Sequence, residues 1–363
     1  MIGRSVLRSA TVVLLMTTSC AAYSQSSITL YGIVDTGVEY YNHAAGGGNF
    51  VGVPTLTGEV PSEWGIAGTE DLGGGNKAFF KLESGFAPGT GSLTYGGREF
   101  GRQANIGLQT PYGSLTLGRQ YTMTAYALLP ADVVGPSIHS LYVFDNYLPN
   151  ARSDNAIGYL GKFAGLTVGA TYSFGRDAAG PAGPAATNCP GQVPGNFPAC
   201  KQYTALIEYD APSFGAAASY DRMRGNAGAS APLTSSGDTD SRSIVDGYIK
   251  FARFKASFGW IHRNLSAGVA STLYNLYFFG LSYTPVSPLV LVAQVDKYIQ
   301  PHVTSSTELI ARASYYLSRN TSVYSSVGYM VNGRNGTTPV AAGGTVEPGA
   351  GQLGVMLGMR HAF

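Results

Sequence analysis

The residues that could carry out a reaction or bind a metal ion are few, and their spacing does not bring them together. The sequence contains no G-x-S-x-G, H-E-x-x-H, P-loop or Cys-x-x-Cys motif. Its glycine-rich stretches, AGGGN and LGGGNK, fall in a predicted loop and a predicted turn rather than before a helix. We therefore expect no enzymatic activity, no cofactor and no metal site. The histidines are equally scattered: His43, His139, His262, His302 and His361.

Two cysteines form the clearest candidate for covalent chemistry. Cys189 and Cys200 lie in one Gly- and Pro-rich stretch, NCPGQVPGNFPACK. In an exported protein this spacing predicts a disulfide that closes the loop, and two free thiols are the alternative.

The N-terminus indicates export. Arg4 and Arg8 precede the short apolar stretch TVVLLM, and small residues follow it in AAYSQ. This pattern predicts a signal peptide over residues 1–24, cleaved after Ser24. Lipidation at Cys20 is the rival interpretation. The apolar stretch is far shorter than the ~20 residues needed for a membrane-spanning helix.

Composition excludes several classes of protein. Of 363 residues only 12% are charged, while glycine (49) and tyrosine (24) are abundant. The formal net charge is +2, and no cluster of Lys and Arg resembles a nucleic-acid-binding surface, so we expect no nucleic-acid partner. Plentiful aromatic and aliphatic residues argue against disorder.

Alternation of apolar with small or polar residues is the dominant pattern after residue 26. In SITLYGIVDTGVEYY, one face carries Ile28, Leu30 and Val34, and the other carries Tyr31 and Asp35. A period of two predicts β-strands with one apolar face. About sixteen such segments are present, at 27–41, 62–70, 76–85, 98–109, 114–121, 152–161, 165–174, 201–210, 214–223, 242–251, 254–263, 273–284, 288–298, 307–316, 320–330 and 351–363.

These strands fit a membrane barrel better than a soluble sandwich or propeller. A soluble β-protein needs a larger charged surface than this chain offers. An outer-membrane barrel turns its apolar face to lipid and places aromatic residues near strand ends, with short turns at one end and long loops at the other. The segments show both features, so we predict a 16-stranded antiparallel transmembrane β-barrel over residues 25–363.

The last thirteen residues, GQLGVMLGMRHAF, alternate to the final aromatic ring. Leu353, Val355, Leu357 and Met359 would face lipid in a closing strand that pairs with the first strand. Because backbone groups in lipid must all be hydrogen-bonded, the sheet has to close on itself. Sixteen strands leave a water-filled lumen, which indicates a pore.

Several stretches resemble the general porins of Gram-negative outer membranes, in particular the proteobacterial branch that includes the neisserial porins. They are ITLYGIVDTG, GTEDLGGGNKAFFKLESGF, FGRQANIGL and YGSLTLGRQYT, and the resemblance covers essentially the whole mature chain. It implies a homotrimer in the outer membrane, surrounded by lipid and lipopolysaccharide, through which small hydrophilic solutes and ions diffuse passively. It also implies that Phe363 belongs to the signal read by the barrel-assembly machinery.

The resemblance further implies that the third external loop folds inward and narrows the pore. The candidate is the longest connection, residues 122–151. Family members oppose acidic side chains of this loop to basic side chains on the barrel wall. Asp132 is the first candidate for the loop carboxylate and Asp145 the second, although either could instead cap a turn.

Four basic residues are candidates for the wall of the constriction: Arg102, Arg152, Arg119 and Lys81. Alternation directs Lys81 into the lumen. It places Arg102 on the apolar face instead. Either a bulge directs Arg102 into the lumen, or it is a structural residue near the trimer centre. We favour the lumen, because an unpaired arginine against lipid is costly.

Glu63 departs from the family pattern, because a basic residue usually occupies this wall position. The stretch here reads SEWGIAGTEDL. We therefore expect a weakly selective channel, with a mild preference for cations. A substrate-specific channel for a sugar, nucleoside or phosphate is the main alternative, and a barrel enzyme or an adhesin are others.

Overall fold

The computed structural model describes residues 27–176, 187–189, 191, 193–268 and 270–363. The predicted signal peptide, residues 1–24, lies outside the described residues. The strands of the sheet are β1 (Ser27–Tyr41), β2 (Phe50–Gly52), β3 (Glu63–Gly73), β4 (Asn76–Gly85), β5 (Gln103–Thr110), β6 (Gly113–Tyr121), β7 (Arg152–Phe163), β8 (Leu166–Ser173), β9 (Gln202–Asp210), β10 (Phe214–Arg224), β11 (Thr239–Phe251), β12 (Phe254–Ala267), β13 (Ala270–Val286), β14 (Leu289–Gln300), β15 (Thr304–Tyr316), β16 (Thr321–Asn332) and β17 (Gln352–Ala362).

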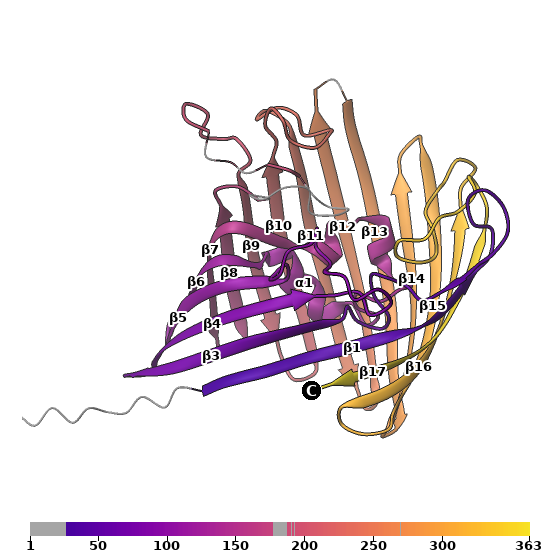
Figure 1. The fold of residues 1–363 in the computed structure, drawn as a ribbon, viewed down its shortest axis with the longest axis horizontal. Helices are drawn as coiled ribbons and strands as arrows, with labels where there is room; N and C mark the ends of the chain where they lie inside the picture. Colours follow the sequence, from indigo (N-terminus) through magenta and orange to yellow (C-terminus); the bar gives the residue numbers. More distant parts are fainter. Residues whose placement is uncertain (1–26, 177–186, 190, 192, 269) are drawn as a thin grey trace, which may run out of the picture.

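The sheet is a closed antiparallel barrel. Each strand from β3 to β17 pairs with the next along the chain, and β1 pairs with both β3 and β17. The short β2 pairs only with the end of β1, outside this ring. Sixteen strands of the described chain therefore form the wall, as predicted (Figure 1).

Alternation assigns the two faces of the wall as expected. On β1, Ile28 and Leu30 are 72% and 62% exposed on the outside, whereas Asp35 is 2% exposed on the inside. On the other strands, too, most of the large side chains exposed on the outside are apolar or aromatic, which fits contact with lipid. No helix among the described residues is long and apolar enough to cross a membrane.

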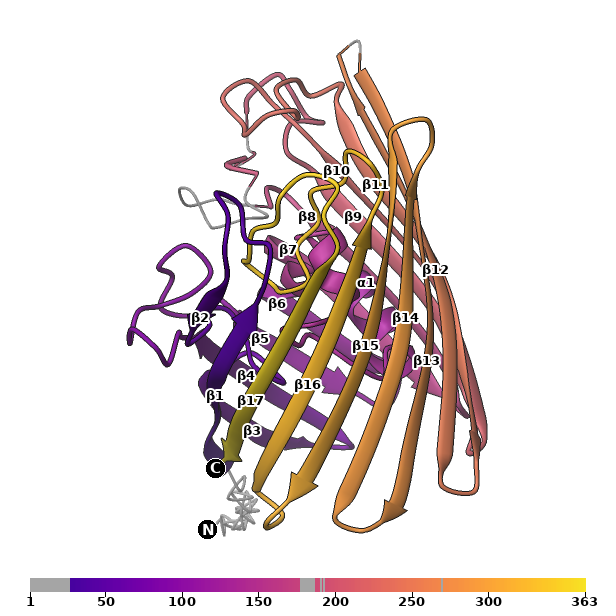
Figure 2. The same ribbon diagram turned by 90° about the vertical axis from the view of Figure 1, so that its right-hand side faces the viewer.

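The last strand closes the barrel against the first. The register runs from Ile33 opposite Ala362 to Tyr41 opposite Gly354. Beyond it, Gly32 and Phe363 exchange two backbone hydrogen bonds of 3.0 Å. The ring of Phe363 lies over Gly32, where any side chain would collide with it. Figure 2 shows the C-terminus among the short turns, at the end opposite the long loops.

One predicted strand begins too early. The segment 98–109 is a strand only from Gln103, and residues 98–102 belong to the preceding loop. Tyr95 and Gly97 adopt positive φ angles of 55° and 78°, so the chain is still turning just before this segment. The expectation of a bulge at Arg102 was wrong, because Arg102 lies before the strand.

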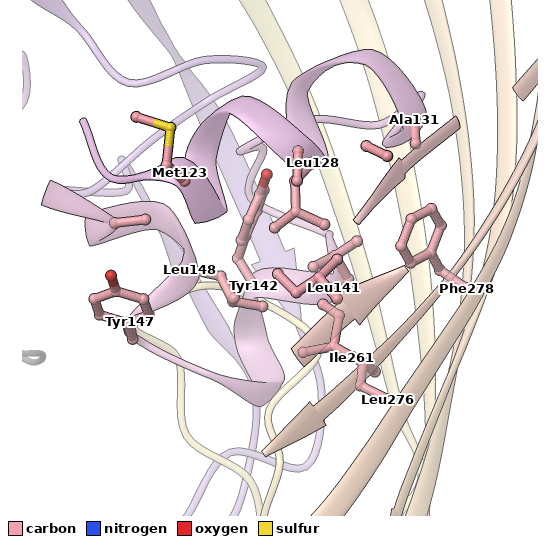
Figure 3. Packing of buried hydrophobic residues seen from close by; sticks show 14 of the residues in the cluster. Met123, Leu128, Ala131, Leu141, Tyr142, Tyr147, Leu148, Ile261, Leu276 and Phe278 are labelled. Carbon is pink, nitrogen blue, oxygen red and sulfur yellow. The ribbon is translucent and has the colours of Figure 1, made fainter. Parts of the chain in front are cut away.

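The third external loop, residues 122–151, folds into the lumen. It contains the helix α1 (Met123–Ala131) and two single turns of 3₁₀-helix, η1 (Leu141–Phe144) and η2 (Leu148–Asn150). Leu128 and Leu141 pack towards Ile261, Leu276 and Phe278 of β12 and β13 (Figure 3). Burial of this apolar contact fixes the loop against one side of the wall, and the apolar inward residues occur where the loop covers them.

Candidate functional site

A buried carboxylate attaches the last part of the inward loop to the wall. Asp145 accepts hydrogen bonds from Arg242 of β11, with Nε at 2.7 Å and Nη2 at 3.1 Å, and from the hydroxyl of Tyr274 of β13. Arg263 of β12 lies 3.7 Å away. Burial opposes ionisation of Asp145, but the charges of Arg242 and Arg263 outweigh it and hold the pKa of this carboxyl well below its usual range.

A second carboxylate holds both ends of the same loop. Asp221 of β10 accepts a hydrogen bond of 2.9 Å from Thr124, at the start of α1, and another from the hydroxyl of Tyr147, just before η2. Gln202 of β9 donates to both Asp221 and Tyr147, at 2.8 Å each. The loop is therefore fixed near its beginning, at Thr124, and near its end, at Asp145 and Tyr147.

Asp132 has a different environment. It is 7% exposed, and its Oδ1 accepts the backbone N–H of Val134 at 3.1 Å, as in a turn capped by an aspartate. Arg312 of β15 donates to the carbonyl of Val134 at 2.9 Å rather than to the carboxylate. Burial raises the pKa of Asp132.

Arg102 reaches the lumen and is surrounded by acids and tyrosines. It forms ion pairs with Glu63 of β3 and, at 2.9 Å, with Glu83 of β4. It also donates to the hydroxyls of Tyr95 at 2.9 Å and Tyr121 at 3.1 Å. Two carboxylates thus surround one guanidinium on this wall.

Arg152 lies beside this cluster, with its guanidinium carbon 4.9 Å from the ring centre of Tyr95 and 4.4 Å from that of Tyr121. Its Nη2 donates to the hydroxyl of Tyr121 at 2.9 Å. The side chain is buried, so its charge is not directly exposed to water in the lumen, and the two rings hold the guanidinium in place.

The remaining predicted wall residues differ in exposure. Arg119 pairs with Asp154, and its Nε donates to the carbonyl of Gly101 at 2.7 Å. Lys81 pairs with Glu83 at 2.9 Å, and its side chain is 33% exposed, against 8% for Arg102 and 11% for Arg119. Lys81 is therefore the most accessible of these three cations to water in the lumen.

Open space remains between the inward loop and this wall. A cavity of about 310 Å³ separates Tyr126 of α1 from the inner faces of β3 to β6. Its wall side is lined by Lys81, Gln103, Asn105 and Gln120, among other polar groups. This cavity lies between the inward loop and the wall that carries Lys81, one of the residues named in the sequence analysis.

A further inward segment was not predicted. Residues 57–62, most of which belong to the connection between the first two predicted strands, enter the lumen: the carbonyl of Gly58 accepts the N–H of Ile138 at 2.8 Å. The N–H of Ala342 donates to the carbonyl of Ile138 at 2.9 Å. Glu59 accepts a hydrogen bond of 2.8 Å from Ser314 of β15, and its own N–H donates to Asp35 of β1 at 3.0 Å. Three loops distant in sequence therefore meet at Ile138.

Arg242, Arg263, Asp221 and Tyr95 were also missed as parts of the site. Strand alternation alone directs Arg242, Asp221 and Arg263 inward, so a systematic search of inward-facing charges on every strand would have found them. Tyr95 lies in a loop, where no period indicates its direction.

Cys189 and Cys200 are joined by a disulfide. Within the described parts of the chain, no three His, Cys, Asp or Glu side chains are grouped as a metal site would require.

A closed barrel with a loop folded into a polar lumen defines the class of outer-membrane channels. The sequence profile of the Gram-negative porin family matches residues 10–335, and the chain belongs to this family. The structure therefore confirms the predicted fold class, and the profile match confirms the family that the sequence resembles. The protein is an outer-membrane channel for passive diffusion of small hydrophilic solutes, and not an enzyme.

Individual relatives support this assignment. Outer membrane porin protein 32 of Delftia acidovorans is 29% identical over 95% of this chain and 96% of its own length. The anion-selective porin from Comamonas acidovorans has the same fold, with a TM-score of 0.78 over 93% of this chain and 100% of its own at 24% identity. The trimer form of OmpT from Vibrio cholerae gives a TM-score of 0.67 over 93% and 99%, at 14% identity.

We expect Asp145→Asn to loosen the inward loop. The substitution leaves Arg242 and Arg263 without their shared carboxylate, and breaking a buried ion pair in this way costs about 3–5 kcal/mol. Single-channel recordings should show larger open-state current fluctuations, and the barrel should unfold at a lower temperature. Glu347→Gln, which neutralises an exposed carboxylate of an external loop, is the control. Equal noise and equal stability in the two variants would contradict the anchoring role.

The same contact predicts how the loop responds to pH. The pKa of Asp145 is lower in the folded protein than its unfolded value of about 3.9, so its stabilising contribution is complete above that value and is lost as the pH falls through the folded pKa. We therefore expect the difference in open-state current fluctuations between the natural protein and Asp145→Asn to stay constant between about pH 5 and 8. A difference that vanishes within this window would show that another group controls the loop.

Proposed function

We propose that this porin is a weakly ion-selective channel whose narrowest passage runs between α1 and the inner faces of β3 to β6. The cavity between Tyr126 and Lys81 carries this proposal, because it is the space that the inward loop leaves open beside the charged wall. Solutes would pass Lys81 directly and feel the remaining wall charges at a longer distance.

Charge compensation on the wall supports weak selectivity. Five cations and three carboxylates lie in this cluster, and Glu63 and Glu83 both pair with Arg102. Asp154 pairs with Arg119, and also with Arg98 at 3.3 Å. The members are Lys81, Arg98, Arg102, Arg119, Arg152, Glu63, Glu83 and Asp154. On the other side, Asp145 is neutralised by its arginine partners. The cluster therefore keeps an excess of two positive charges, and because most of these side chains are paired and buried, this excess would reject cations only weakly.

We also propose a homotrimer surrounded by outer-membrane lipid and lipopolysaccharide. The trimer form of the Vibrio cholerae porin, which shares the fold, supports this assembly, and the apolar outer face of the wall supports the lipid contact.

Sedimentation of the detergent-solubilised protein tests the assembly. We expect a protein mass of three chains, each of 38.0 kDa before processing. A single-chain mass in several mild detergents, with the barrel still folded, would contradict the trimer and leave the channel assignment intact.

Glu63 provides a test of the selectivity proposal. Glu63→Gln removes one of the two carboxylates beside Arg102, and Glu63→Arg adds a positive charge at the same position. We expect the chloride-to-potassium permeability ratio to rise about twofold to fivefold for Glu63→Gln. This range corresponds to an interaction of roughly 0.5–1 kcal/mol between a charge on the wall and a permeating ion in water. Reversal potentials in a salt gradient measure this ratio, and Glu63→Arg should shift it further.

Glu70→Gln, at the other end of the same strand, is the matched control and should leave the ratio unchanged. If Glu63→Gln behaves like this control, Glu63 does not act on the permeating ions. A strong preference of the natural protein for chloride would overturn weak selectivity itself.

We propose that Phe363 also acts in assembly, as part of the signal read by the barrel-assembly machinery. Its deletion should reduce the amount of folded protein in the outer membrane while leaving the conductance of assembled channels unchanged. Gly32→Val separates recognition from packing, because it crowds the ring of Phe363 but keeps the terminal residue. This variant should mainly lower the free energy of unfolding, by about 1–3 kcal/mol, because the added side chain overpacks the site. Normal outer-membrane levels after deletion would refute the assembly role.

A further inference from the structure

Two lysines face each other at the short-turn end of the barrel. Lys250 of β11 and Lys255 of β12 are directly opposite in the antiparallel register. Lys250 is two residues from the buried Tyr248 on the same strand, and Lys255 is two residues from the buried Ser257. Because side chains alternate between the two faces of a strand, both lysines belong to the inner face. Like charges directly opposite on neighbouring strands destabilise a sheet, so this pair requires compensation.

The protein itself provides only part of that compensation. The ammonium groups of Lys250 and Lys255 lie 4.7 and 4.6 Å from the ring centre of Tyr248. Lys255 also donates to the carbonyl of Pro130 in α1. Across the described residues, neither lysine forms an ion pair with a carboxylate. Asp210, the acid beyond the ring, accepts the hydroxyl of Tyr248 and lies 3.9 Å from Lys162.

A pocket of about 510 Å³ opens beside this pair. Its polar lining consists of three cations and three hydroxyls, without a single acid: Lys250, Arg253, Lys255, Ser282, Thr284 and Ser287. The turn that carries Arg253 is held in place, because its carbonyl accepts the N–H of Thr284 at 3.1 Å and its guanidinium donates to the carbonyl of Pro285. The cations are therefore presented by a fixed hairpin rather than by a free loop.

This combination of groups suits an oxyanion. Ammonium and guanidinium groups form short, charge-assisted hydrogen bonds with phosphate oxygens, and hydroxyl groups can donate to the same oxygens. A bound anion would also offset the repulsion between the two lysines. We propose that this pocket is a phosphate-binding site at the periplasmic mouth of the channel, separate from the constriction.

Two sources of phosphate can reach this position. Inorganic phosphate can arrive through the lumen, which both lysines face. A phospholipid head group can arrive from outside, since Phe251, Phe254 and Tyr283 stack on one another at the same level, as in the aromatic girdle of the interface. The shared chemistry is the phosphate group, and the experiment distinguishes the two sources.

Calorimetric titration of the purified, detergent-solubilised protein with inorganic phosphate tests the site directly. We expect saturable binding by the natural protein and at least tenfold weaker binding by the double variant Lys250→Gln/Lys255→Gln. Lys250→Gln alone keeps the contact of Lys255 with α1, so it should weaken binding severalfold without disturbing the inward loop. Lys77→Gln is the matched control. Lys77 lies next to the short turn between β3 and β4, so it is also at the short-turn end of the barrel, and its side chain is on the same inward face as that of Lys81.

Native mass spectrometry after extraction from the membrane distinguishes the lipid source. If a head group occupies the pocket, the natural protein and Lys77→Gln retain a phospholipid that the double variant loses, and inorganic phosphate displaces it. If free phosphate is the ligand, only the calorimetric difference is seen. Equal affinity of the natural protein and the double variant for both probes would overturn the proposal, as would an equal loss in Lys77→Gln. Neither measurement depends on conductance, so failure here would leave the channel function untouched.

Discussion

The structure depends on the requirement that every backbone hydrogen-bonding group of a strand in lipid be paired. Closure of β17 on β1 meets this requirement, and it sets the perimeter of the wall. A wall of sixteen strands is too wide for its own inward side chains to fill. The lumen therefore contains water except where the chain itself enters it, and the inward loop and residues 57–62 determine how much of it stays open.

Placing a loop inside a polar lumen creates an energetic difficulty that the charged contacts resolve. The loop has to lose water from its own backbone and side chains, and the apolar patch around Leu141 and Ile261 favours this only on one side. Asp145 and Asp221 add contacts that are strong in a poorly solvated interior and specific in direction. Paired charges thus stabilise the side of the lumen to which the loop is attached, whereas the opposite wall keeps Lys81 in contact with water.

The strands and their lipid-facing sides could be predicted from the sequence because alternation is a local property that every strand repeats. The closing strand at 351–363 is an example, whereas the inward course of residues 122–151 was expected from the resemblance to porins and from the length of the connection. Local patterns fail where the chain leaves the strand period, as before Gln103, and this is why alternation by itself gave the wrong face for Arg102. Contacts such as Glu63 with Arg102 or Asp145 with Arg242 could not be predicted as pairs, since the three-dimensional course of the loops decides which inward charges meet.

The meeting of three loops at Ile138 has a consequence for how this protein can vary. Its hydrogen bonds to Gly58 and Ala342 use only backbone atoms, but the junction is tightly packed: Ile138 is fully buried, and a Cβ at Gly58 would collide with the carboxylate of Asp35 and the hydroxyl of Tyr324. The parts of the same loops outside this junction make none of these contacts, so they can change in sequence and length while the internal junction keeps its geometry. Surface diversity and a constant passage can then evolve independently in one polypeptide.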